Sequence, residues 1–230
     1  MMQLHHLASL LHLSDPTLPV GGYSHSAGLE TYVQQRLVKD VASAEQYIRQ
    51  MLQVNIRYND AAFASLAYDA ATADDITTLL LLDETAEALK APREIRQASQ
   101  KLCLRLIKIF SRQQDLPLLT AYHQTIRNGN AAGHYAIAFG AYAAAWQIPK
   151  EAALYAFYYN ATVGIVTNCV KLIPLGQLDG QDMLFRLQPA LQQLALATLQ
   201  PDPDRLGLCS PAFDIRCMQH ERLYSRLYMS

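Results

Sequence analysis

The sequence AAGHYAIAFGAYAAAWQIPKEAALYAFYYNATVGIVTNCVKL, residues 131–172, decides the fold class of this chain. It holds two long runs without a formal charge, one on each side of a short segment that contains Pro149. Proline suits the first turn of a helix, so the stretch predicts two helices, at residues 132–147 and 150–172. Both runs carry polar side chains among their apolar residues, and the mean hydropathy of the chain is +0.00. These features favour buried core helices over membrane spans.

Outside that stretch, apolar residues recur at helical spacing, and Pro, Gly or Asp marks the breaks. No segment is convincing as a strand. In the helix that starts at Asp40, Ser43 and Gln46 are placed to form a capping box. We therefore predict an all-α protein, a single domain over residues 1–230 with about ten helices and no sheet. The other helices are expected at about residues 4–13, 28–38, 40–71, 74–90, 93–113, 118–127, 181–199 and 211–228.

Small residues repeat every four positions in the first uncharged helix, at Ala132, Ala136, Gly140 and Ala144. Such a stripe lets a second helix approach closely. The approaching helix belongs either to the same chain or to a second copy, and the sequence leaves both interpretations open. The stripe and the two uncharged helices lead us to expect a symmetric homodimer.

The composition restricts the classes of function. Nineteen Lys and Arg stand against twenty Asp and Glu, for a formal net charge of −1, so general binding to nucleic acid or to a membrane is not expected. The N-terminus has neither the positive start nor the small-residue cleavage site of a secretory signal. Four scattered cysteines indicate reduced thiols of a cytoplasmic protein. They are Cys103, Cys169, Cys209 and Cys217.

The loop LPVGGYSHS, residues 18–26, invites comparison with two enzyme motifs. A phosphate-binding loop needs a lysine directly after its glycines, and the first lysine of this chain is Lys39. A nucleophile elbow needs Gly-x-Ser-x-Gly after a strand, whereas here Ser26 stands where the second glycine is required. We therefore expect no catalytic residue and no cofactor, so that the chain is not an enzyme.

A metal-binding site is the second kind of functional site to consider. Cys217 and His220 are three residues apart on a predicted helix, and Cys209 lies nearby in the sequence. A thiolate and an imidazole would suit zinc or nickel. The three residues lack the paired spacing of a structural zinc site, and isolated cysteines are often simply buried. We therefore predict no metal site here.

Three segments are more specific. They are LSDPTLPVGGYSHSAGLE at residues 13–30, NCVKLIPLGQLDGQ at residues 168–181 and HERLYSRLYMS at residues 220–230. Together they resemble the urease accessory protein F family, in this order and at these places, and the likeness covers essentially the whole chain. The resemblance implies an all-α, homodimeric scaffold protein without an active site.

The resemblance also implies partners. Members of the family join urease accessory protein D, or H in some systems, and recruit accessory protein G, a GTPase that carries nickel. The assembly delivers nickel to apo-urease with hydrolysis of GTP. On this interpretation the chain positions the GTPase and couples its nucleotide state to metal release. The alternative is a metallochaperone that holds nickel directly, through Cys209, Cys217 and His220.

Four residues receive roles from the resemblance. Tyr23 and Arg226 match residues that hold the partner-competent conformation of the family, and Glu30 and Lys171 match polar contacts for the GTPase. Arg and Tyr side chains also crowd the end of the chain, where segments fray unless they are docked. We therefore expect residues 223–230 to become ordered at a partner or dimer interface.

Overall fold

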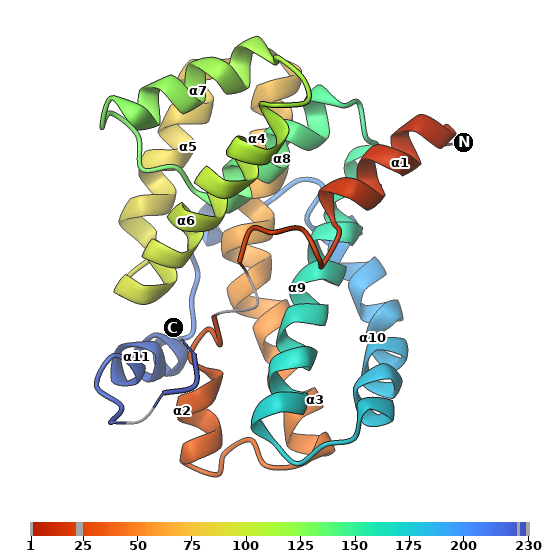
Figure 1. The fold of residues 1–230 in the computed structure, drawn as a ribbon, viewed down its shortest axis with the longest axis vertical. Coiled ribbons are helices and arrows are strands. Elements are labelled where there is room, and N and C mark those ends of the chain that lie inside the picture. Colours follow the sequence, from red (N-terminus) through yellow and green to blue (C-terminus); the bar gives the residue numbers. More distant parts are fainter. Residues whose placement is uncertain (1, 22–24, 225, 229–230) are drawn as a thin grey trace.

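A computed structural model describes residues 2–21, 25–224 and 226–228 of the chain. Within these ranges every regular element is a helix and there is no strand, which confirms the prediction of an all-α fold (Figure 1). Tyr23 lies outside the described residues, so its predicted role stays a prediction. None of the described helices combines the length and the apolar character that crossing a membrane requires.

The elements follow one another with short connections. The segment η2 is a π-helix, and it joins α3 to α4 in one continuous helix that runs from the lower to the upper part of Figure 1. In chain order the elements are α1 Leu4–Leu13, α2 Leu29–Gln34, α3 Val41–Gln50, η2 Met51–Ala61, α4 Ala62–Thr72, α5 Ile76–Leu89, α6 Arg93–Phe110, α7 Pro117–Arg127, α8 Tyr135–Ala145, α9 Lys150–Leu172, α10 Gln177–Ala197, η3 Pro203–Arg205 and α11 Pro211–His220.

Most helices lie close to their predicted positions. Those expected at residues 4–13 and 150–172 have those bounds, and the long helix from about residue 40 to residue 71 is also present. The predicted capping box of Ser43 and Gln46 is wrong. The Asp40 carboxylate accepts the backbone N–H of Ser43 at 2.8 Å, and the Ser43 hydroxyl accepts the backbone N–H of Asp40 at 3.1 Å. Asp40 precedes the first turn, so its side chain caps the helix one turn earlier than predicted.

The uncharged helix α8 lies inside the core. Its residues 136–143 are all buried, and it packs mainly on α4 and α6. A helix that is apolar on every side is stable only where neighbours cover it completely. Gly140 faces α4, where a Cβ would lie 2.1 Å from the carbonyl oxygen of Ala64. The small residues of α8 therefore serve packing within the chain, and their interpretation as a subunit interface is wrong at Ala136 and Gly140.

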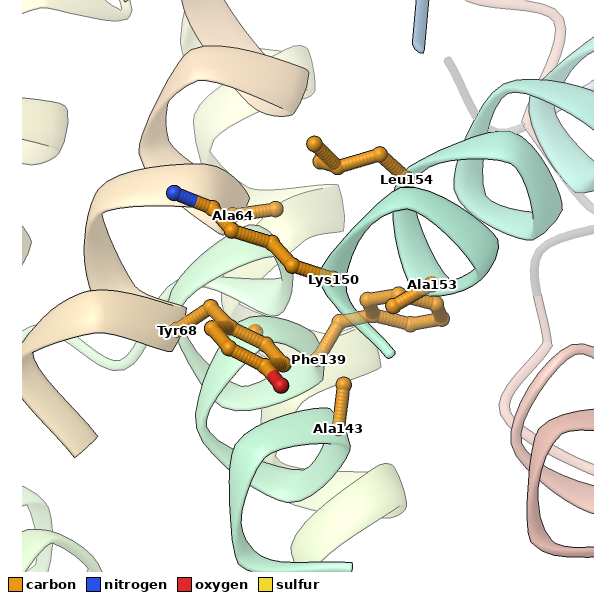
Figure 2. A pocket seen from close by; sticks show the side chains of 8 residues that line it. Ala64, Tyr68, Phe139, Ala143, Lys150, Ala153 and Leu154 are labelled. Atoms are coloured by element: carbon orange, nitrogen blue, oxygen red, sulfur yellow. The ribbon is translucent and has the colours of Figure 1, made fainter. Parts of the chain in front are cut away.

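Figure 2 shows the place where α4, α8 and α9 meet. Tyr68 of α4 donates its hydroxyl to the carbonyl oxygen of Ile148 at 2.8 Å. Lys150, the first residue of α9, donates to the Asp69 carboxylate and to the carbonyl oxygen of Leu199, at 2.7 Å each. The small pocket that these helices line has no space for a water molecule.

Replacing Gly140 with alanine is expected to lower the free energy of unfolding by about 2 kcal/mol, because the new methyl group forces α8 away from α4. Gly164, within α9, is a matched control, since a Cβ there meets nothing within 4 Å. Gly164→Ala should raise stability by about 0.5–1 kcal/mol, as expected for removing a glycine from a helix interior. Urea denaturation followed by circular dichroism measures both changes. Equal effects of the two substitutions would contradict the close approach at Gly140.

Candidate functional site

Helices α2 and α11 pack side by side, so residues 29–34 lie next to residues 211–220, which are far from them in the sequence (Figure 1). Gly28 is the N-cap residue of α2 and has a φ of 77°, and a Cβ there would lie 2.7 Å from the Cys217 sulfur of α11. Glycine therefore permits both the left-handed backbone and the close contact of the two helices. This packing places Glu30 of α2 next to His220, the last residue of α11.

Glu30 is buried, with 5% of its surface exposed. Its carboxylate holds residues 226–228, which we call the C-terminal segment. One oxygen accepts the backbone N–H of Leu227 at 2.8 Å, and the other accepts the backbone N–H of Tyr228 at 3.3 Å. The second oxygen also lies 3.2 Å from Nε2 of His220. These partners offset the cost of burying a carboxylate.

His220 is fully buried and lies between two carboxylates. Its Nδ1 is 2.7 Å from Glu94 Oε2, and its Nε2 faces Glu30. Ionised carboxylates only accept hydrogen bonds, so both contacts are hydrogen bonds only when the ring or one carboxyl group carries an additional proton. Arg226 completes the cluster through an ion pair with Glu94 Oε1 at 2.8 Å. We call Glu30, Glu94, His220 and Arg226 the C-terminal latch.

The end of the chain, where the C-terminal latch forms, differs from the prediction. Helix α11 ends at His220, so the prediction of a helix up to residue 228 is wrong. Beyond His220 the backbone N–H groups of Leu227 and Tyr228 bind Glu30 instead of continuing a helix, and Arg226 binds Glu94. The segment is thus docked on its own chain, whereas ordering at a partner or dimer interface stays a prediction.

The structure brings two of the predicted site residues together. Glu30 and Arg226 are connected through Glu94 and His220, whereas Lys171 is exposed in the last turn of α9 and takes no part in this cluster. Glu30 was expected to contact the GTPase, but in this conformation its buried carboxylate serves the chain itself. Sequence reasoning missed Glu94, because an acidic residue in the first turn of a helix is ordinary. Nothing local connects it with His220, 126 residues away.

A groove of about 400 Å³ lies between α6, α9 and η2. Asn160, Gly164 and Thr167 of α9 line it, and Lys171 follows them at helical spacing on the same face of α9. Ser26 also lines the groove, and its buried hydroxyl has no hydrogen-bond partner among the described residues. Lys171 therefore lies one helical turn beyond the part of α9 that lines the groove.

The candidate metal ligands do not come together as a metal site. Among the described residues, no group of three or more His, Cys, Asp and Glu side chains is placed to hold a metal ion. Burial raises the pKa of the Cys217 thiol, and a hydrogen bond to Asp214 is the main cause that raises the pKa of Cys209. Both thiols are therefore protonated at neutral pH, and His220 has carboxylates at both ring nitrogens. This geometry does not favour direct binding of nickel.

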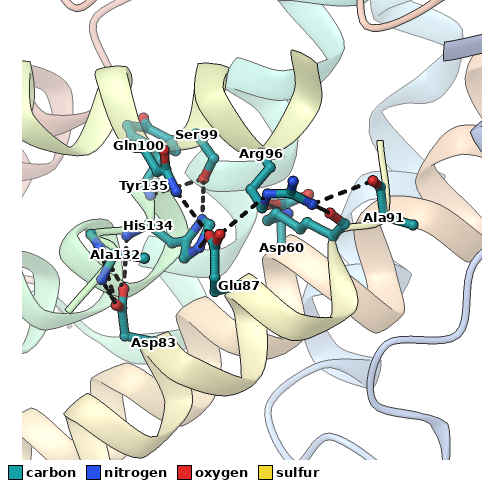
Figure 3. Close-up of polar contacts among 12 residues, drawn as sticks. Asp60, Asp83, Glu87, Ala91, Arg96, Ser99, Gln100, Ala132, His134 and Tyr135 are labelled. Atoms are coloured by element: carbon teal, nitrogen blue, oxygen red, sulfur yellow. Dashed lines mark hydrogen bonds and ion pairs between the residues drawn. The ribbon is translucent and has the colours of Figure 1, made fainter. Parts of the chain in front are cut away.

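A second buried polar cluster organises the loop that leads into α8 (Figure 3). Asp83 of α5 is fully buried and accepts the backbone N–H groups of Ala132, Gly133 and His134 at 2.7, 3.0 and 2.9 Å. The Tyr122 hydroxyl donates to the same carboxylate at 2.5 Å. One side chain therefore satisfies three consecutive backbone donors of the loop.

The His134 side chain extends this cluster towards α6. Its Nε2 lies 2.9 Å from the Glu87 carboxylate, and its Nδ1 lies 3.2 Å from the Ser99 hydroxyl. Burial is the main cause that lowers the pKa of His134, so the ring is neutral at neutral pH, donating to Glu87 and accepting from Ser99. The order of groups resembles a catalytic triad. The Ser99 hydroxyl, however, also accepts the backbone N–H of Tyr135 at 3.1 Å, so we assign these residues to positioning α8.

Comparisons with known proteins agree with each other. A sequence model of the UreF family matches residues 38–188. The urease accessory protein UreF of Actinobacillus pleuropneumoniae serotype 5b is 52% identical over 224 residues, which cover 97% of this chain and 99% of that protein. The proteins of the same description from Haemophilus influenzae and Nostoc sp. are 51% and 36% identical, and the alignments cover 97% and 98% of this chain and 95% and 96% of those proteins. The chain therefore belongs to the UreF family of urease accessory proteins.

Proposed function

We propose that this chain is a non-catalytic scaffold of urease maturation that acts as a single domain in the cytoplasm. It joins accessory protein D, or H in some systems, and the pair recruits accessory protein G, the nickel-carrying GTPase. The assembly then regulates the GTPase for nickel insertion into apo-urease. The likeness to urease accessory proteins along 97% of the chain is the observation that carries this proposal. The buried polar clusters around Asp83 and His134, which position helices, are consistent with it.

Two parts of the surface receive different roles in this proposal. Lys171 contacts the GTPase, as the family resemblance implies, and this residue is exposed in the last turn of α9. Glu30 and Arg226 act indirectly, since they hold the C-terminal segment against α2 and α6. The C-terminal latch thus sets the conformation that partners meet. Tyr23 receives the same role from the family resemblance alone.

The homodimer belongs to the same proposal, but its surface is not the buried stripe of α8. Helix α10 offers a better one. Leu178 and Phe185 lie on one face of α10 and are 79% and 73% exposed, and Leu196 follows on that face with 46% exposed. Exposed apolar side chains at helical spacing are typical of a surface that a second protein covers.

Lys171→Glu is expected to weaken recruitment of the GTPase by about ten-fold, because it replaces an attraction at an exposed contact by a repulsion. Lys39→Glu is the control, since Lys39 is also exposed and lies before α3. Each variant would be co-purified with the D-type protein and with the GTPase separately, and light scattering would give the mass of each complex. Nickel-dependent activation of urease completes the set of measurements.

The scaffold mechanism predicts a selective result. Lys171→Glu should reduce GTPase binding and urease activation, while the D-type protein still binds and the scattering mass still corresponds to two copies of this chain. Wild-type protein that binds neither partner would overturn the proposed function. Normal GTPase binding by Lys171→Glu would show that the contact lies on other residues.

A further inference from the structure

Helix α6 presents a strongly basic face. Lys101, Arg105 and Lys108 are exposed, and their spacing of three or four residues places them on the same side of the helix. Arg93 at the start of α6 and Arg112 just after its end are also exposed and extend the row of cations along the helix axis. At about 1.5 Å per residue, the cations from Arg93 to Lys108 span roughly 22 Å. We call Arg93, Lys101, Arg105, Lys108 and Arg112 the basic face of α6. In the view of Figure 1, α6 crosses in front of α4 and α8.

The charges of the basic face are not neutralised within the described part of the chain. None of the ion pairs found there includes any of its five residues, and Arg105 donates only to the backbone oxygen of Val20 at 3.0 Å among the hydrogen bonds found. Glu94, the acidic residue in the first turn of α6, is occupied by His220 and Arg226. The positive charge of the basic face is therefore available to a partner.

The positive charges of the basic face act on the neighbouring side chain of His25. The pKa of His25 is lowered, first by burial and then by the positive charges of Lys101 and Arg105, while the more weakly acting Glu94 raises it. The cations of the basic face thus outweigh the nearby carboxylate. The whole chain has a net charge of −1. The positive charge is therefore concentrated in this region, and the molecule as a whole carries no excess of positive charge.

An exposed leucine within the basic face indicates the class of partner. Leu104 is 40% exposed and lies between Lys101 and Lys108 on the helix surface. Protein interfaces combine apolar contacts with a polar rim, whereas contacts to a phosphate backbone are made by polar and charged groups and not by leucine. An overall negative chain is also a poor general ligand for nucleic acid or anionic lipid. The face therefore fits another protein better than a polyanion.

We propose that the basic face of α6 docks an acidic surface of another protein of the urease maturation assembly, with Leu104 at the centre of the contact. The existence of such a partner rests on the proposed function. The new part of the inference is the surface that binds the partner and the negative charge that the partner must carry there. Carboxylates spaced by one helical turn on the partner would face Lys101, Arg105 and Lys108 in register. This surface is distinct from Lys171 on α9, so the two contacts are separable by mutation.

The test compares two variants that change the net charge equally. Lys101→Glu with Lys108→Glu alters the basic face and leaves Arg105 in contact with Val20. The control is Lys39→Glu with Arg127→Glu, two exposed positions outside α6. Association with immobilised D-type protein, GTPase and apo-urease would be measured at low and high salt, with transfer RNA and phosphatidylglycerol vesicles as additional probes.

We expect the Lys101 and Lys108 variant to associate with one of the three proteins at least ten-fold more slowly than the control at low salt. The difference should vanish near 1 M salt, where charges are screened within about 3 Å. Wild-type protein that binds none of the three would show that the proposed function fails. Binding of a protein at the same rate by both variants would overturn the docking surface alone. Selective binding of transfer RNA or vesicles through Lys101 and Lys108, with protein association unchanged, would also overturn it.

Discussion

Asp83→Ala is expected to lower the free energy of unfolding by about 3–5 kcal/mol, the range for removing one partner from a buried charged cluster. The substitution leaves the backbone N–H groups of Ala132, Gly133 and His134 and the Tyr122 hydroxyl without their acceptor. Since all four donors lie at the entrance to α8, the loss should loosen the helix that forms the core. Thermal and urea denaturation of the purified protein measure the effect.

Two further variants make the result specific. Asp83→Asn keeps the shape and one acceptor oxygen, so it should lose clearly less stability than Asp83→Ala. Asp182→Ala, at an exposed position of α10, should change the free energy of unfolding by less than about 0.5 kcal/mol. An Asp83→Ala protein as stable as Asp182→Ala would mean that the carboxylate does not organise this loop.

Glu30→Ala is expected to release the C-terminal segment. The carboxylate is buried and binds two backbone N–H groups and His220, so its removal should weaken the docking of residues 226–228 by about 3 kcal/mol. Hydrogen exchange at the amides of Leu227 and Tyr228 should then become about 100-fold faster, since 1.4 kcal/mol corresponds to a factor of ten. Helix content should stay the same, because the segment adds no helix beyond α11.

Glu84→Ala is the control for Glu30→Ala, because Glu84 is exposed on α5. It should leave exchange at Leu227 and Tyr228 unchanged. Arg226→Ala removes the other connection of the segment and should produce a smaller increase in exchange, since the Arg226 side chain is 37% exposed. Slow exchange at both amides in Glu30→Ala would contradict the role given to this carboxylate.

Much of the fold follows from local patterns. Apolar spacing, prolines and glycines locate most of the helices, because each of these signals acts within a few residues. The uncharged stretch that contains Gly140 correctly indicates buried helices. Local patterns did not single out the π-helical segment η2, in which each hydrogen bond spans five residues instead of four.

The candidate site is less accessible to such reasoning. The resemblance singled out Glu30 and Arg226, but not that both belong to one cluster through Glu94 and His220. Asp83 was not singled out, because its partners lie about 50 residues away and are backbone groups of no particular residue type. The final residues have no helix-breaking sequence, yet contacts made across the whole chain override their local preference. Such contacts are visible only when the fold is known.

The contact of residue 30 with residues 227 and 228 also determines when the region around α2 can finish folding during synthesis. A growing chain folds from its N-terminal part onwards, so α2 forms long before its partner residues leave the ribosome. Until then the Glu30 carboxylate must stay hydrated, because burying it without those backbone N–H groups is costly. The region around α2 therefore reaches its final form only after residues 227 and 228 have been translated. Chains that stop before residue 227 leave the Glu30 carboxylate hydrated and differ from longer chains at this surface.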